Sequence, residues 1–270
     1  MINWRLQVRA TIGRAYPRAV GALREPSWMF FDVFLPLLGI AAFIYYYRAL
    51  GAPPVFEGFV VIGGAMTAFW LSVMWGMATQ FYWEKETGNL ELYMMAPMSK
   101  MSILAGMALG SMILMTVRAI STIVLGVIIF NVQLNLSAPL LIVGTFVLTL
   151  LALYGMGMMF ASLYMHWGRG AWHFSNLMQE PIYLVSGFYF PVRELGFYVA
   201  IGSSIIPITL GLDAMRQLLF GSSANGLLPV MEELAILVAL AVVFIIAAYY
   251  ALRYMEHLGK KDGRLLLRSQ

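Results

Sequence analysis

The sequence predicts an all-α membrane protein with six transmembrane helices, on three observations. Of its 270 residues, 61% are hydrophobic and only 11% are charged, whereas an average soluble domain is about a quarter charged. The mean hydropathy is +0.80. The apolar residues stand in long continuous runs, and an α-helix needs about 20 of them to cross a hydrocarbon core about 30 Å thick. This composition excludes a soluble globular domain and a disordered chain.

Six apolar runs have the length that a membrane span needs. The predicted spans are residues 30–47, 58–81, 103–130, 140–165, 174–190 and 234–252. The fifth is short and is interrupted by Pro181 and Gly187. The apolar stretch that follows it, residues 195–206, has only 12 residues and is too short to cross. Because non-helical backbone at membrane depth must be buried in protein, we expect a re-entrant helical pair between spans five and six.

The chain before the first span predicts a helix that lies in the cytoplasmic membrane interface, over residues 1–27. At helical spacing one face is apolar, formed by Val8, Ile12, Tyr16, Val20 and Leu23. Arg14 and Arg18 project from the opposite face, which we expect to lie toward anionic headgroups. An irregular basic leader is the alternative. A six-span bundle (residues 28–255) and a cytoplasmic tail (residues 256–270) complete a single domain without a nucleotide-binding domain.

The distribution of Lys and Arg predicts the orientation of the bundle. Thirteen of the 17 basic residues fall in the N-terminal segment, the loops after spans two and four, and the C-terminal tail. The six spans place all of these segments on one side. Basic residues favour the cytoplasmic side, so both termini are expected in the cytoplasm. The net charge of +4 is therefore a topology signal and does not indicate nucleic-acid binding.

The loop between spans two and three, residues 84–100, has the densest charge cluster between the two ends of the chain. Thr87-Gly88-Asn89 predicts a turn. Residues 90–96 then predict a short helix that Pro97 ends, and Ser99 can cap the helix that follows. A short amphipathic helix can dock in a groove on a soluble partner. A solvated linker is the alternative.

The third span has a partly polar face, formed at helical spacing by Ser111, Met115, Arg118 and Thr122. A central Arg costs about 2.5–3.5 kcal/mol on insertion scales, so Arg118 is expected to face protein or water. The face either lines a transport pathway or holds an Arg that binds neighbouring backbone. Gly106 and Gly110 on the same span would allow close helix packing.

The sequence predicts no catalytic or metal site on this chain. It contains no Gly-x-x-x-x-Gly-Lys-Ser/Thr phosphate loop, since the one Gly-Lys pair, at Gly259, is followed by Lys261. It contains no cysteine, and its three histidines are dispersed. We therefore expect no cofactor on this chain.

Three segments together carry a family resemblance. The first is Glu84 and Glu86 with Gly88, Leu90-Glu91 and Pro97-x-Ser99, the second is Pro181…Ser186-Gly187…Phe190-Pro191, and the third is Pro207-x-Thr209…Asp213-Ala214-x-Arg216…Gly221. In this order and spacing they resemble the membrane subunit of the ABC-2 family of ABC exporters, which includes polysaccharide, lipo-oligosaccharide and drug exporter permeases. Departures from the family pattern are Asn89, Ile206 and Leu195-Gly196.

The resemblance implies a permease in a bacterial inner membrane that exports an amphipathic or lipid-linked substrate. Two copies of a separate ABC ATPase would hold ATP and Mg, and two copies of this chain would form a homodimer through spans one, two and five. The implied coupling residues are Glu84, Glu86, Gly88, Leu90, Glu91, Leu92 and Pro97. The implied outer gate is Pro181, Ser186, Gly187, Phe190, Pro191 and Pro207. A non-transporting scaffold subunit and a lipid-modifying enzyme are the alternatives.

Overall fold

The computed structural model describes residues 4–24, 26–167 and 170–261, and this part of the chain contains helices and no strand. The elements are α1 (Trp4–Leu23), α2 (Pro26–Ala49), α3 (Val55–Leu71), the π-helix η1 (Ser72–Ala78), α4 (Gln80–Glu86), α5 (Asn89–Met95), α6 (Lys100–Phe130), α7 (Pro139–Trp167), α8 (Gly170–Val185), the 3-10 turn η2 (Val192–Leu195), α9 (Phe197–Ser203), α10 (Pro207–Phe220), the 3-10 turn η3 (Gly221–Ala224) and α11 (Val230–Lys261). The structure is 85% helical, which confirms the all-α prediction.

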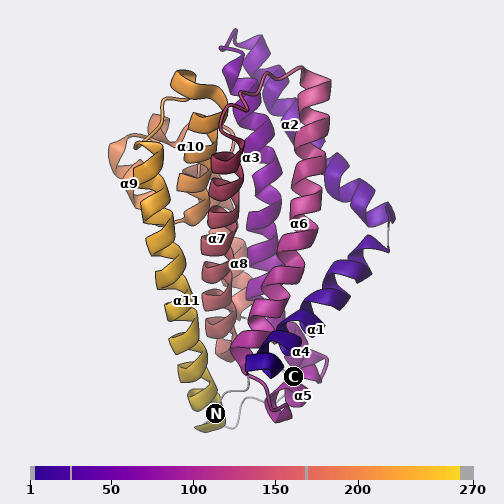
Figure 1. Ribbon diagram of the computed structural model, residues 1–270. Coiled ribbons are helices and arrows are strands. Elements are labelled where there is room, and N and C mark those ends of the chain that lie inside the picture. Colours follow the sequence, from indigo (N-terminus) through magenta and orange to yellow (C-terminus); the bar gives the residue numbers. More distant parts are fainter. Residues whose placement is uncertain (1–3, 25, 168–169, 262–270) are drawn as a thin grey trace.

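Five described helical segments are long and apolar enough to cross a membrane. They are Phe30–Ala49, Val55–Glu84, Lys100–Phe130, Pro139–Tyr164 and Val230–Leu258. The pair α9 and α10 is bent by 112° at a short break, which is the geometry of a broken span or a re-entrant loop. Both helices lie at the end of the bundle where α8 ends and α11 begins (Figure 1). The predicted pair of short helices between spans five and six is therefore present.

The fifth span lies four to five residues earlier in the chain than the sequence predicts. We expected it over residues 174–190, but α8 ends at Val185 and residues 186–191 leave the helix. Its 16 residues give a length of about 24 Å. The apolar run misled the prediction because Ser186, Gly187 and Phe188 are buried by packing against other helices rather than by helical continuation. Pro191 is buried among them.

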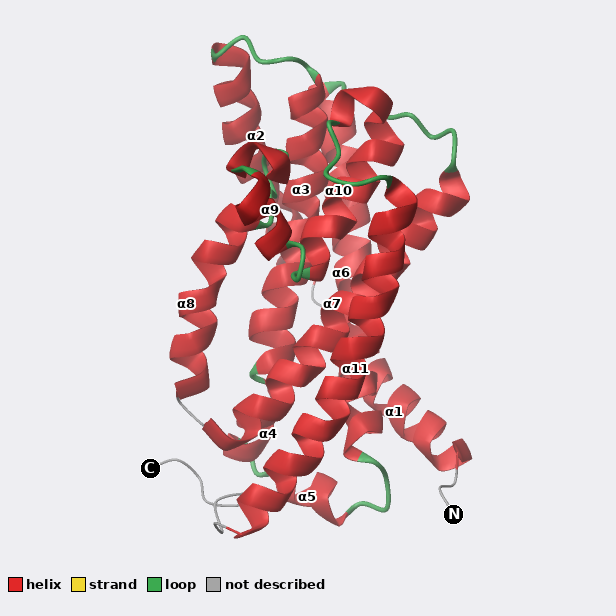
Figure 2. Ribbon diagram, turned by 90° about the vertical axis from the view of Figure 1, so that its left-hand side faces the viewer, coloured by secondary structure: helices red, strands yellow, loops and turns green. Residues whose placement is uncertain are grey.

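The bundle has two ends that differ in content. The α5 end contains α1, α4, α5 and the last turns of α11, and the α9 end contains α9, α10 and the loops after α2 and α6 (Figures 1 and 2). The chain passes between the ends in α2, in α3 with η1, in α6, in α7, in α8 and in α11. An ion pair of 2.5 Å from Lys100 to Glu256 joins α6 to α11 at the α5 end.

The central element is the segment formed by α3 and η1. In its most apolar window 83% of the residues are buried, against 17% in α2. Its side chains Met66, Phe69, Trp70 and Met74 belong to the main hydrophobic cluster, which α6, α7 and α10 complete. Any movement of this segment must therefore displace the core of the bundle.

Candidate functional site

The turn between α4 and α5 has the local structure that the sequence predicts. Gly88 has φ +78° and ψ 0°, a left-handed conformation that glycine adopts without steric cost. Helix α5 ends at Met95, since Ala96 is extended before Pro97. The hydroxyl of Ser99 accepts a hydrogen bond from the Met101 amide at 3.2 Å and caps α6. Residues 87–99 therefore form a short, well-bounded helical projection, as predicted.

Helix α5 presents apolar side chains outward. Leu92 is 60% exposed and Met95 is 75% exposed, although burying such side chains is favourable. Pro97 is exposed beside them, and Glu86 and Gly88 are half-buried. The backbone of Leu90 and Glu91 lies on α5, but their side chains fall outside the described part of the structure. The expected coupling residues thus lie together at the α5 end, around one exposed apolar surface.

Glu84 lies behind this surface in a partly buried ion pair. Its carboxylate pairs with the guanidinium of Arg14 on α1. It also accepts a hydrogen bond of 2.7 Å from the Gln80 amide. The same guanidinium lies 5.2 Å from the centre of the Tyr93 ring, and burial raises the pKa of the Tyr93 hydroxyl. These contacts join α1, α4 and α5 into one unit.

Arg18, one turn further along α1, extends this network to the π-helix. It donates to the Gln80 side-chain oxygen and to the Gly76 carbonyl, both at 2.8 Å. Burial lowers its pKa, while the carboxylate of Glu84 opposes that shift. The prediction that Arg14 and Arg18 face lipid headgroups is therefore wrong, because both bind protein groups on the second span.

The opposite, apolar face of α1 is the exposed one. Its exposed side chains include Val8, Ile12 and Tyr16. On the side of α1 that packs against the bundle, Gly106 and Gly110 of α6 leave room for the α1 backbone. A Cβ on Gly106 would lie 2.5 Å from the Thr11 carbonyl oxygen, and one on Gly110 would lie 2.8 Å from that of Ala15. Gly106 and Gly110 therefore allow α1 to pack closely against α6.

The π-helix η1 connects three other helices. Its Gly76 carbonyl accepts the bond from Arg18 on α1, and its Ser72 hydroxyl accepts a hydrogen bond of 3.0 Å from the Tyr154 hydroxyl on α7. The indole N–H of Trp75 donates to the Gln179 side-chain oxygen on α8 at 2.7 Å. π-Helical segments are often found at functional sites. This one lies between the network of α1 and the core.

At the α9 end, the segment after α8 is folded against the second span. The amide of Ser186 closes α8 by donating to the Ile182 carbonyl at 2.9 Å, and Gly187 then turns the chain with φ +67°. Of the expected gate residues, Ser186, Gly187 and Pro191 are buried and Phe190 is half-buried. Pro207 is buried in the first turn of α10, whereas Pro181 is exposed within α8 and lies apart from them.

Arg216 on α10 is the residue that organises this segment, and the sequence prediction did not assign it a role. Its guanidinium donates to the carbonyl oxygens of Gly187 at 2.7 Å, Phe188 at 2.8 Å and Phe190 at 3.1 Å. A fourth bond, of 3.1 Å, reaches the Phe59 carbonyl on α3. Carbonyl partners have no side-chain signature, so only the family motif around Arg216 could have drawn attention to it.

Of the expected pathway residues on α6, Arg118 lines a small cavity of about 10 Å³ together with Asp32, Val33 and Leu114. Ser111, Met115 and Thr122 are buried on the inner face of α6. Arg118 is partly exposed and binds α2, since its Nε donates to the Asp32 carbonyl at 2.5 Å and its Nη1 lies 3.4 Å from an Asp32 carboxylate oxygen. Its role in transport stays a prediction.

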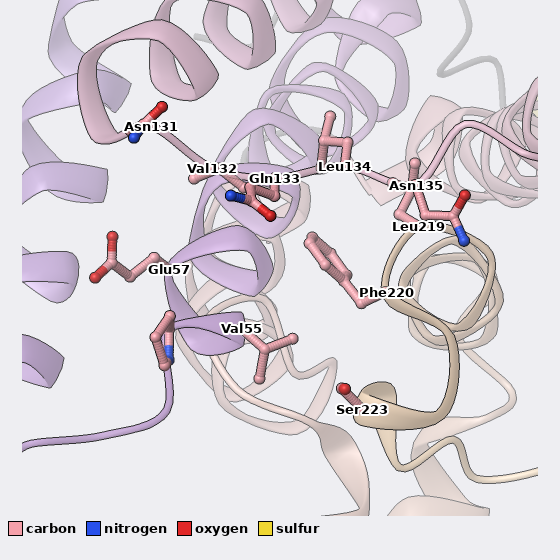
Figure 3. A pocket seen from close by; sticks show the side chains of 11 residues that line it. Val55, Glu57, Asn131, Val132, Gln133, Leu134, Asn135, Leu219, Phe220 and Ser223 are labelled. Carbon is pink, nitrogen blue, oxygen red and sulfur yellow. The ribbon is translucent and has the colours of Figure 1, made fainter.

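A cavity of about 620 Å³ opens at the α9 end. Figure 3 shows the 131–135 segment along one side of it, facing Val55, Phe220 and Ser223. Its polar lining includes the amide side chains Asn131, Gln133 and Asn135 and the carboxylate of Glu57, which Arg48 binds at 2.7 Å. Within the described residues, no group of three His, Cys, Asp or Glu side chains could hold a metal ion.

The comparison with protein families decides what kind of protein carries these features. The family model for the ABC-2 type transporter matches residues 19–220, which is most of the chain. The chain belongs to the ABC-2 type transporter family. Residues 19–220 of this ABC-2 protein include the central span, the α4–α5 turn, the segment after α8 and Arg216. No curated protein sequence matches the chain significantly.

Membership in the ABC-2 family has three direct consequences. The chain is a transporter permease component and a multi-pass membrane protein. Permeases of this family are generally non-catalytic transport subunits. They generally partner with an ABC ATPase. The structural features at the two ends of the bundle are therefore features of a transporter permease component.

Proposed function

We propose that this ABC-2 protein is the transmembrane permease of an ATP-driven exporter. It moves an amphipathic or lipid-linked substrate out of the cytoplasm by alternating access, in a bacterial inner membrane with both termini in the cytoplasm. The supporting observation is the position of α5, which presents exposed Leu92 and Met95 at the tip of a segment continuous with the central span. A short helix with an apolar surface fits a groove on a soluble partner.

The contacts behind α5 support a path for coupling. A displacement of α5 is transmitted to Arg14 through its contacts with Tyr93 and Glu84. Gln80 and Arg18 continue the path to the Gly76 carbonyl in the π-helix. Because this segment lies in the packed core, its displacement shifts α6, α7 and α10 with it. ATP and Mg²⁺ belong to the ATPase subunit in this proposal.

The surface of α2 supports a dimer of two copies, each bound to one ATPase. Its exposed large apolar side chains include Phe30, Phe31, Phe34, Leu35, Leu38, Phe43, Tyr45 and Tyr46. Tyr189, in the segment after α8, stacks on Phe43 at 4.1 Å between ring centres, so the two elements adjoin. Lipid would also cover such a surface, and the stoichiometry of the purified complex decides between the two.

Reconstitution with the ABC ATPase that co-purifies with the chain tests the proposal. Wild-type chain in proteoliposomes should raise the ATPase activity, and Leu92→Asp should abolish that rise because it puts a charge on the apolar surface of α5. Leu92→Met keeps the surface apolar and should retain the rise. ATPase activity that ignores the chain, or that Leu92→Asp leaves unchanged, contradicts the proposal. A scaffold subunit would bind the ATPase but support no ATP-dependent flux.

A further inference from the structure

Arg216 is enclosed more completely than any other cation described above. Only 1% of its surface is exposed, although an arginine almost always lies at a protein surface. All four of its hydrogen bonds go to main-chain carbonyl oxygens, three of them in the 187–190 segment and one on α3. The guanidinium also lies 5.1 Å from the centre of the Phe59 ring. One side chain of α10 thus holds two other elements together.

These bonds engage both Nη atoms of the guanidinium, whereas its buried Nε–H has no hydrogen-bond partner. Within the described residues no carboxylate forms an ion pair with Arg216, and the side chain of Asp213, one turn earlier, is engaged by the Leu227 amide at 2.6 Å. A buried cation is costly unless hydrogen bonds satisfy it. The carbonyl oxygens of Gly187, Phe188 and Phe190 are therefore fixed where they stand, because moving them away leaves the guanidinium unsatisfied.

The second span is shaped to receive this segment. A Cβ on Gly63 would lie only 1.5 Å from the Phe188 carbonyl oxygen and 3.0 Å from an Arg216 nitrogen. Any side chain at position 63 would thus force the 187–190 segment off α3. The close approach and the four carbonyl bonds are independent features that favour the same closed arrangement.

We propose that Arg216 is a positioning residue that latches the outer gate, by holding the 187–190 segment closed against the second span. The inference rests on the proposed transport function, because it takes the α9 end as the outer side. Outward opening must separate the 187–190 segment from α3, and that step breaks the bonds from one or both Nη atoms. A shift of α3 driven from α5 acts directly on the Phe59 carbonyl, and so on the latch.

The two Nη atoms of the Arg216 guanidinium explain why a lysine at this position cannot make the same contacts. These two Nη atoms point to four oxygens at once, whereas a lysine ammonium is a single point charge with three donors on a flexible four-carbon stem, and it does not reach as far. Arg216→Lys keeps the charge but loses part of the carbonyl contacts. Since each hydrogen bond to a charged group is strong, losing one raises the open fraction of the gate by at least about tenfold.

Thiol labelling in lipid nanodiscs tests the latch without the ATPase. The chain contains no cysteine, so Ser186→Cys is a unique reporter, and Ser186 is buried with a hydroxyl that has no hydrogen-bond partner. In this background Arg216→Lys should raise the rate of reaction with a water-soluble maleimide at least about tenfold. Arg193→Lys is the matched control, because Arg193 is exposed at the same end and makes a single bond of 3.2 Å, to the Gly226 carbonyl.

A second reporter separates gate opening from unfolding. Ser162 on α7 is buried against α11, and its hydroxyl donates to the Met158 carbonyl at 2.8 Å. Labelling of Ser162→Cys should therefore not change with Arg216→Lys. If Arg216→Lys does not fold, Gly63→Ala displaces the same segment and should expose Ser186→Cys in the same way. Gly39→Ala is its control, since a Cβ there meets nothing within 4 Å.

Proteoliposomes with the co-purified ATPase and entrapped carboxyfluorescein then test the gate itself. Arg216→Lys should leak dye without ATP and keep its ATPase activity, whereas a merely structural change would lower activity without a leak. Unchanged labelling of Ser186→Cys in folded Arg216→Lys and Gly63→Ala overturns the latch. Increased labelling without a leak overturns its gating role. Failure of the proposed function is distinguishable, because the wild-type chain would then not stimulate the ATPase.

Discussion

Arg14 and Glu84 form an ion pair between segments 70 residues apart in the sequence, and Tyr93 of α5 lies over the same guanidinium. The pair joins the N-terminal helix to the end of the second span. It also places a charged contact directly behind the exposed surface of α5. The N-terminal helix is thereby part of the coupling apparatus that we propose, and each of its contacts can be tested separately.

Removal of the Arg14 cation should destabilise the α5 end. Arg14→Met leaves the buried Glu84 carboxylate without its cation, and we expect the free energy of unfolding to fall by about 1–3 kcal/mol. Unfolding of the purified protein in detergent measures the change. Arg9→Met is the control, because Arg9 is exposed on the same helix. The double variant Arg14→Met/Glu84→Met should cost less than the sum of the single ones. A neutral Arg14→Met would show that the pair does not hold α1.

Gly106 should be intolerant of a single added methyl group. A Cβ there lies 2.5 Å from the Thr11 carbonyl and 2.8 Å from the Arg14 Cβ, so Gly106→Ala must push α1 away from α6. Trypsin should then cleave α1 several-fold faster, because the helix opens locally more often. Gly144→Ala on α7 is the matched control, since a Cβ at that position meets nothing within 4 Å. Equal cleavage of the two variants would refute the packing role of the glycine pair.

The parts of the structure that sequence reasoning predicted correctly are those that local chemistry determines. Gly88 turns the chain because it adopts a positive φ, Pro97 ends a helix because its neighbour cannot be helical, and Ser99 caps the next one with its own hydroxyl. Long apolar runs likewise determine the spans. Each of these outcomes depends on residues a few positions apart, so the sequence pattern contains them.

The sequence predictions that are wrong concern residues whose contact partners lie far away in the sequence. Arg14 and Arg18 point inward because Glu84, Gln80 and a π-helix carbonyl receive them, and no pattern within α1 reveals those partners. The same holds for the segment after α8, whose apolar sequence predicts more helix. There, the guanidinium of Arg216 satisfies the carbonyls that would otherwise need helical hydrogen bonds. Main-chain acceptors leave no trace in a sequence.

Arg118 can be assigned to structure or to the transport pathway by one pair of variants. Its bonds to Asp32 join α6 to α2, so Arg118→Gln should lower the unfolding temperature by several degrees if they are structural. Asp32→Asn keeps the carbonyl acceptor and should have a smaller effect. If Arg118 lines the pathway instead, Arg118→Gln changes ATP-dependent flux while the unfolding temperature stays that of the wild type.

The orientation of the bundle is the prediction on which the coupling mechanism depends. The absence of cysteine makes single reporters possible at both ends, at Asn89 on α5 and at Ser223 near α10, both of which are exposed. In intact spheroplasts a membrane-impermeant maleimide should label Ser223→Cys at once. Asn89→Cys should react only after the membrane is permeabilised, because the basic residues gather at the α5 end. The reverse pattern would place α5 on the side without ATP, where no cytoplasmic ATPase reaches Leu92.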